Sequence, residues 1–164
     1  MKTLIILRHG KAESYNEDGD RVRQLAERGF RDAKTMGHVI AAKVGIPDLV
    51  VSSDAVRARQ TAVEAAREAG YKGRIQYQPD IYEANSRTLL RVVRSLPDTA
   101  STVLLVGHNP GLEDLGADLI AGELSIAGLP TAGMYVITIQ GSWSEADVDD
   151  GSLLGSYSPK EIHQ

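Results

Sequence analysis

Cysteine is absent from this sequence of 164 residues, which excludes disulfide bonds, thiolate nucleophiles and zinc sites with cysteine ligands. A basic excess is also absent, since the formal net charge is −4 and nucleic-acid-binding domains usually carry a positive balance. The first apolar run, residues 4–7, is far too short for a membrane span or for the apolar part of a signal peptide. We therefore expect a cytoplasmic protein that binds neither nucleic acid nor membranes.

Aromatic residues make up only 5% of the chain, but the remaining composition is that of an ordinary globular protein, with 42% hydrophobic and 24% charged residues. A chain of this length favours one domain, and no internal repeat or low-complexity linker divides it. We predict a single domain over residues 1–164. From about residue 141 the chain is polar and rich in Gly and Ser, and we expect residues 151–157 to form a flexible end.

Short apolar runs alternate with segments of helical periodicity along the chain. The runs predict strands at residues 3–7, 48–52, 74–78, 102–106 and 134–140, and the periodic segments predict helices at 26–44, 54–69, 86–96 and 109–121. Such an alternation is typical of a three-layer α/β sandwich with a mainly parallel central sheet. We expect the weakest strand, 74–78, to lie at or near an edge of that sheet.

Polar residues of an unusual kind follow three of these strands. The first strand ends at Arg8 and His9, the second leads through two serines to Arg57, and the fourth leads to His108. Ligands of open parallel sheets bind at the carboxyl ends of the strands. If the three strands are neighbours, two imidazoles and two guanidiniums meet at one place. Because arginine presents a fork of donors that matches phosphate oxygens, the pattern predicts a site for a phosphoryl group.

Each of these residues alone also has a plainer interpretation. His9 fits a polar residue at a strand boundary, and His108 fits a cap or hydrogen-bonding residue. Arg57 fits an ion pair with Asp54 or Glu64 along its own helix. It is the coincidence at three strand ends that favours a shared site.

Taken together, the motifs LRHG at 7–10, SSDAVRARQT at 52–61 and VGHNPG at 106–111 resemble those of the histidine phosphatases, a superfamily that includes the phosphoglycerate mutases. RHGKAE at 8–13 and R-x-L-x-x-R-G at 23–29 are similar to the compact SixA-type phosphohistidine phosphatases. The resemblance covers roughly residues 3–140. One departure is Ala26, which stands where the family usually has Thr, so the helix that follows lacks a preferred N-cap.

The resemblance implies that His9 is the nucleophile and forms a transient phosphohistidine, without a metal or another cofactor. Three side chains would hold the phosphoryl oxygens: Arg8, Arg57 and His108. Their cations would also favour the uncharged form of His9 by like-charge repulsion. Glu83, in the segment IYEA, matches the position where the family often has its proton donor, and Asp20 is the alternative.

Further substrate contacts are expected next to these residues. Gly10 has no side chain and would let the backbone approach the phosphate. Asn109 precedes a proline at an expected helix start, where the helix dipole favours an anion. Three basic residues are expected contacts at the rim of the site: Lys11, Arg21 and Arg23.

The expected substrate depends on the segment between the second helix and the fourth strand. Mutases of the superfamily have a lid inserted after the second helix, whereas here residues 70–101 are taken up by a strand and a helix. We therefore expect no lid and an open site, which suits a phosphorylated protein such as a histidine-phosphotransfer domain. The alternatives are a phosphatase of small phosphate esters and, in a different class, a non-catalytic phosphate-binding adaptor.

Overall fold

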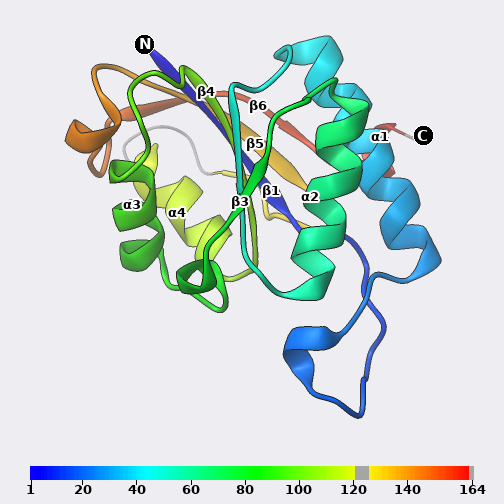
Figure 1. Cartoon of the computed structure of the whole chain (residues 1–164). Helices are drawn as coiled ribbons and strands as arrows, with labels where there is room; N and C mark the ends of the chain where they lie inside the picture. The colour runs from blue at the N-terminus through cyan, green and yellow to red at the C-terminus, as the bar shows by residue number, and fades with distance from the viewer. Residues whose placement is uncertain (121–125, 163–164) are drawn as a thin grey trace.

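A computed structural model describes residues 1–120 and 126–162 of the chain. Its six strands are β1 (Lys2–Arg8), β2 (Leu49–Ser52), β3 (Ile75–Tyr77), β4 (Thr102–Gly107), β5 (Met134–Ile139) and β6 (Gly151–Tyr157). The helices are α1 (Glu27–Lys43), α2 (Val56–Glu68), α3 (Ser86–Arg94), α4 (Gly111–Leu119) and α5 (Pro159–Ile162), with 3-10 turns η1 (Asp20–Val22), η2 (Pro79–Ile81) and η3 (Trp143–Glu145). Figure 1 shows α1 and α2 on one face of the sheet and α3 and α4 on the other.

The strands form one sheet in the order β3-β2-β4-β1-β5-β6. β1, β2, β3 and β4 are parallel, and β5 runs antiparallel to both of its neighbours. The expected three-layer sandwich with a mainly parallel sheet is confirmed, and so is the position of β3 at an edge. No extra domain interrupts the connection from α2 to β4.

The alternation of side chains along β1 supplies both halves of the core. Leu4 and Ile6 point into the cluster beneath α3 and α4, whereas Ile5 and Leu7 point into the cluster beneath α1 and α2. All four side chains are fully buried. A strand that is covered on both faces reads as a continuous apolar run, which is why this segment is recognisable in the sequence.

The helix starts differ in detail from the prediction. α1 begins at Glu27, and its N-cap residue, Ala26, makes no side-chain cap because a methyl group cannot accept a hydrogen bond. α2 begins at Val56, two residues later than expected, because Asp54 pairs with Arg21 and does not cap the helix. α4 runs from Gly111 to Leu119, and the expected end at residue 121 lies outside the described residues.

The prediction of a flexible end at residues 151–157 is wrong, because these residues form β6 and pair with β5 along its whole length. The glycines and serines of β6 hide its strand character in the sequence. Gly151 is required by the packing of β6 against β5, because a Cβ at this position would lie 2.8 Å from the Ile137 side chain. Trp143 in the preceding turn is fully buried and donates its indole N–H to the Ala100 carbonyl at 2.7 Å.

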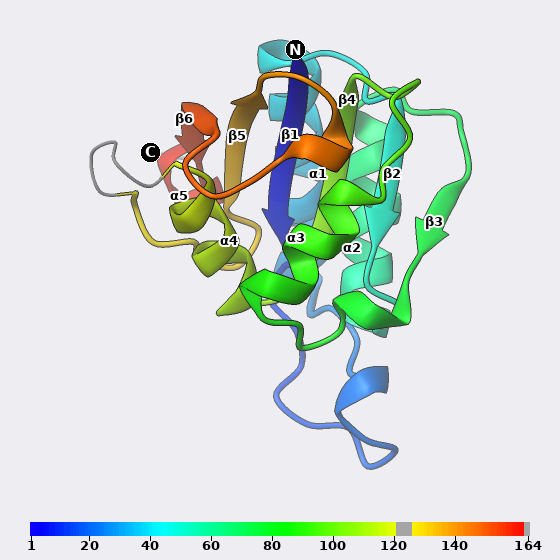
Figure 2. The same cartoon turned by 90° about the vertical axis from the view of Figure 1, so that its left-hand side faces the viewer.

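A long loop, residues 11–25, extends away from the body of the molecule beyond the carboxyl ends of the parallel strands (Figures 1 and 2). We call it the arm. An antiparallel bridge between Ala12 and Leu25 closes its base, and the Leu25 N–H donates to the Gln60 side chain on α2 at 2.8 Å. The arm therefore begins and ends next to the strand ends where the site is predicted.

Among the described residues, none of the helices combines the length and the apolar character that a bilayer crossing requires. The cytoplasmic location and the single domain remain predictions.

Candidate active site

The three strand ends that the sequence singles out lie side by side, because β4 is hydrogen-bonded to both β1 and β2. In the register of the sheet Arg8 pairs with Gly107, and Ser52 pairs with Val106. The ring centroids of His9 and His108, which follow β1 and β4, are 5.2 Å apart. The structure thus brings the two imidazoles together at the carboxyl edge of the sheet.

The tautomer of His9 is set by its own backbone neighbour. Its Nδ1 lies 2.8 Å from the carbonyl oxygen of Gly10, and because a carbonyl oxygen can only accept, Nδ1 carries the proton. Nε2 then has a free lone pair. His9 is only 9% exposed, so little water competes for that lone pair.

Both imidazoles are uncharged at neutral pH. The pKa of His9 is lowered to about 4, mainly by burial; the hydrogen bond to Gly10 opposes this shift, and the guanidinium groups of Arg57 and Arg8 add to it. Burial, followed by the proximity of His9 and Arg57, lowers the pKa of His108 to about 3. Burial is the larger cause for both rings, whereas the sequence pointed to like-charge repulsion.

His108 has the opposite hydrogen-bonding arrangement. Its Nε2 lies 2.8 Å from the hydroxyl of Ser53, and that hydroxyl accepts from the Ala55 N–H and keeps its own proton to donate. The hydroxyl could also accept a second hydrogen bond; we assign Nε2 as the acceptor, which leaves the hydrogen of this neutral ring on Nδ1. Nδ1 is buried and has no partner among the residues that the structure describes. His108 can therefore donate a hydrogen bond to an added ligand.

Arg8 is held by the segment before β5. Its Nη1 donates to the Leu129 carbonyl at 3.1 Å, and the Asn109 side-chain amide donates to the same carbonyl at 2.8 Å. The Leu129 N–H donates to Glu113 at 2.6 Å. Asn109 also accepts from the Glu113 N–H at 3.2 Å, so both ends of its side chain are engaged. Asn109 therefore supports Arg8, through Leu129, and the first turn of α4, through Glu113. Its expected role as a direct substrate contact stays a prediction.

Arg57, on the first turn of α2, is held by the arm. Its Nη1 donates to the Asp20 backbone carbonyl at 2.8 Å, and its Nη2 donates to the Asp20 carboxylate at 3.1 Å. The same carboxylate accepts from Arg23 at 2.8 Å and from the Tyr82 hydroxyl. Arg57 does not form the alternative pair with Asp54 or Glu64.

Two guanidinium nitrogens remain without a partner. Among the described residues, the Nε atoms of Arg8 and Arg57 are buried and unpaired, like Nδ1 of His108. Buried donors are nearly always satisfied in proteins, so these three donors are open to acceptors that the described residues do not supply. An anion with several oxygens fits this need.

Gly10 is required by packing. Its N–H donates to the Thr61 hydroxyl at 3.0 Å, and that hydroxyl donates to the Arg57 carbonyl at 2.8 Å. A Cβ at position 10 would lie 2.8 Å from the backbone oxygen of Gly29 in α1. The glycine therefore brings α1 close to β1, and its N–H is already used.

The expected rim residues occupy different environments. Arg21 pairs with Asp54 at 2.7 Å, and its guanidinium lies 4.3 Å from the centre of the Tyr82 ring. Arg23, besides its bond to the Asp20 carboxylate, donates to the Glu13 carbonyl at 2.8 Å. Lys11 is exposed. Of the three, Lys11 is the one most free to reach toward a bound partner.

The two candidate proton donors also differ. Hydrogen bonds from Tyr82 and Arg23 hold the pKa of Asp20 well below its usual range, so Asp20 is a carboxylate at neutral pH. This speaks against Asp20 as the acid. Glu83 is exposed and follows Tyr82 with a backbone φ of 51°.

A family description, histidine phosphatase superfamily (branch 1), matches residues 4–89, more than half of the chain. The chain belongs to this superfamily.

Relatives and solved structures agree with the assignment to the histidine phosphatases. An uncharacterised protein of Mycobacterium tuberculosis (strain ATCC 25618 / H37Rv) is 29% identical over 94% of this chain and 100% of its own length. A candidate SixA phosphohistidine phosphatase from Nakamurella multipartitia superposes with a TM-score of 0.85 at 27% identity, covering 96% of both chains. The protein histidine phosphatase SixA complexed with tungstate also gives 0.85, at 21% identity over 98% of this chain and 99% of the other, which shows the shared fold.

Sequence reasoning missed two kinds of residue at this site. Ser53 and Thr61 were within a quoted motif, but their roles depend on partners from other strands. Tyr82 received no role, although its ring contacts His108 edge-on with centroids 5.4 Å apart. Nothing in the composition distinguishes Tyr82 from the other five tyrosines of the chain.

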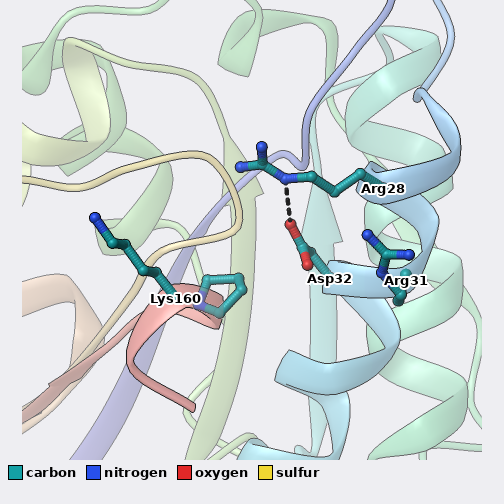
Figure 3. Close-up of a pocket in the computed structure, with 5 residues that line it drawn as sticks. Arg28, Arg31, Asp32 and Lys160 are labelled. Atoms are coloured by element: carbon teal, nitrogen blue, oxygen red, sulfur yellow. Dashed lines mark hydrogen bonds and ion pairs between the residues drawn. The ribbon is translucent and has the colours of Figure 1, made fainter. Parts of the chain in front are cut away.

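A separate basic hollow lies elsewhere on the molecule. It has a volume of about 500 Å³ and is lined by Arg28, Arg31, Asp32, Pro159 and Lys160. Figure 3 shows the ion pair between Arg28 and the buried Asp32, and Lys160 on α5 with its side chain directed away from that pair. None of the residues grouped around His9 lines this hollow, so it provides control positions outside the candidate site.

Proposed function

We propose that the protein is a phosphatase that removes the phosphoryl group from phosphohistidine on another protein through a phosphoenzyme formed on His9. The observation that carries the proposal is an imidazole with an unprotonated Nε2 next to His108 and near Arg8 and Arg57, each of which has a buried donor without a partner among the described residues. A nucleophile beside free donors is the arrangement that phosphoryl transfer needs, because catalysis of this reaction is mainly positioning and charge stabilisation.

The reaction takes two in-line displacements. In the first, the lone pair on Nε2 of His9 forms a bond to phosphorus, and the bond from phosphorus to the substrate's imidazole nitrogen breaks. The leaving nitrogen keeps the electron pair, and because the other ring nitrogen already carries a proton, the product is a neutral imidazole. In the second, a water oxygen attacks phosphorus, the bond to Nε2 breaks, and inorganic phosphate leaves. Arg8, Arg57 and His108 stabilise the charge on the equatorial oxygens in both steps.

The state of the two acids supports a substrate with a good leaving group. Asp20 is ionised and fully engaged, and Glu83 is exposed to solvent. An alkoxide leaving group needs a well-placed proton donor, whereas an imidazole that is already protonated on its other nitrogen leaves without one. Phosphohistidine therefore suits this site better than an alkyl phosphate does.

The absence of an inserted lid supports a protein substrate. The chain from α2 to β4 contains only β3, η2 and α3, and the site lies at an open edge of the sheet next to the arm. A phosphorylated side chain on a folded partner can reach such a site. The similarity to a protein histidine phosphatase agrees with phosphohistidine on a protein as the substrate, and we propose a phosphorylated histidine-phosphotransfer domain as the partner.

The test offers the purified protein a phosphorylated histidine-phosphotransfer domain and 3-phosphoglycerate in parallel, with His9→Ala as the inactive variant. Arg31→Gln, in the separate hollow, is the control variant: it removes a charge outside the candidate site. We expect a higher kcat/KM for the phosphoprotein, loss of activity in His9→Ala, and full activity in Arg31→Gln. Faster turnover of 3-phosphoglycerate would support a small-molecule phosphatase, and no turnover of either would support a binding adaptor.

A further inference from the structure

The Asp20 carboxylate connects the arm to the candidate site. It accepts from Arg57, Arg23 and Tyr82, which come from α2, from the arm itself and from the segment before α3. Its side chain is 43% exposed, whereas that of Arg57 is 6% exposed. A carboxylate at the surface thus fixes a guanidinium that lies almost completely inside.

The geometry at Arg57 divides the guanidinium into two edges. The edge formed by Nη1 and Nη2 is bound to the backbone oxygen and the carboxylate of Asp20. The Nε–H has no partner among the described residues. Since a guanidinium carries five N–H groups in a rigid plane, fixing one edge determines the direction of the other.

We propose that Asp20 is a positioning residue, which orients Arg57 so that its Nε edge is presented to the phosphoryl group, and that Tyr82 holds Asp20 in place. The inference rests on the proposed function only in assuming that Arg57 binds the phosphoryl oxygens. It assigns the arm a part in the site: Arg57 is oriented only while residues 20–23 are docked against it.

Tyr82 can hold Asp20 in place because both its hydroxyl and its ring are in contact with other residues. Its hydroxyl donates to the Asp20 carboxylate, its ring contacts His108, and Arg21 lies over one face of the ring. Arg21 is fixed in turn by Asp54 at the start of α2. The Tyr82 ring therefore links the arm, α2 and the end of β4.

Three roles of Asp20 predict different results for Asp20→Asn. If Asp20 only repels anions, removing its charge tightens the binding of inorganic phosphate. If Asp20 is the proton donor, the loss of kcat grows as the leaving group of an aryl phosphate becomes more basic. If Asp20 positions Arg57, phosphate binds more weakly, and kcat/KM falls by a similar factor for every aryl phosphate in the series.

The experiment measures the dissociation constant of inorganic phosphate and kcat/KM for a series of aryl phosphates in four proteins. These are the wild type, Asp20→Asn, Tyr82→Phe and the control Asp18→Asn, which makes the same change at an exposed position of the same arm. We expect Asp20→Asn to weaken phosphate binding and to lower kcat/KM by about tenfold or more, independent of the leaving group. Tyr82→Phe is expected to act in the same direction by a smaller factor, and Asp18→Asn is expected to match the wild type.

Unchanged or tighter phosphate binding in Asp20→Asn, or a loss that depends on the leaving group, would overturn the inference. If Asp20→Asn does not fold, Tyr82→Phe decides, and wild-type phosphate binding in that variant would overturn it. Failure of the proposed function looks different, because the wild type itself would then prefer 3-phosphoglycerate to the phosphoprotein, or would turn over no substrate while still binding phosphate.

Discussion

The imidazole rings of His9 and His108 lie next to each other with centroids 5.2 Å apart and planes inclined by 57°. Their hydrogen bonds use opposite ring nitrogens. His9 is bound through Nδ1 and keeps a lone pair on Nε2, whereas His108 is bound through Nε2 and keeps a hydrogen on Nδ1. The pair therefore offers one nucleophile and one donor to the same small space, which a phosphoryl group can use together.

The first prediction concerns the titration of this pair. Burial lowers the pKa of His9 to about 4 and that of His108 to about 3, so both rings should stay neutral down to about pH 5. NMR titration of labelled imidazoles in the free protein measures this directly. Arg57→Gln should raise the pKa of His9, yet leave it below 6.5, because burial is the larger cause. Titration of His9 near 6.5 in the wild type would contradict the buried environment.

The same shifts make stability depend on pH. Above pH 6.5 both rings are neutral in the folded and in the unfolded chain, so they contribute no pH dependence there. As the pH falls below 6.5, the unfolded state takes up protons first, and the free energy of unfolding decreases until the folded pKa values are passed. In His108→Asn the decrease between pH 7 and pH 5 should be smaller, which denaturant unfolding at the two pH values checks.

The second prediction concerns the contact between α1 and the strand end. A Cβ on Gly29 would lie 2.1 Å from the backbone oxygen of Lys11, which cannot move away as a side chain could. Gly29→Ala should therefore lower the free energy of unfolding by about 1–3 kcal/mol, even though alanine favours the helix. Gly128→Ala is the control, since the nearest atom there is the Glu113 carboxylate oxygen at 3.4 Å. Equal stability of the two variants would contradict the close approach of α1.

The third prediction concerns Glu83. If it is the proton donor, Glu83→Gln should lower kcat most for alkyl phosphates, whose leaving groups need a proton, and by less than about threefold for phosphohistidine. Steady-state rates over substrates of graded leaving-group basicity measure this dependence. A large, uniform loss for all substrates would show that Glu83 acts on the site in another way.

Much of the site could be predicted because it depends on short, regular elements. β1, β2 and β4 are buried runs that end in polar residues, and neighbouring parallel strands bring their carboxyl ends together. That rule places Arg8, His9 and His108 at one edge once the three strands are neighbours, and Arg57 follows on the first turn of α2.

The remaining contacts depend on long-range packing. Asp20 reaches Arg57 only because the arm folds back against α2, and Asn109 faces Leu129 because of the segment before β5. β6 escaped prediction since its Gly and Ser residues suit an edge next to β5 and carry little apolar pattern. No local pattern in the sequence encodes these partners.

The phosphoenzyme itself provides the most direct test of the account. The protein is mixed with a phosphorylated histidine-phosphotransfer domain, quenched within milliseconds under alkaline conditions, and mapped by mass spectrometry and phosphorus NMR. We predict a phosphoryl group on Nε2 of His9, absent from His9→Ala. Phosphorylation of another residue, or unchanged turnover by His9→Ala, would contradict the central claim that His9 is the nucleophile.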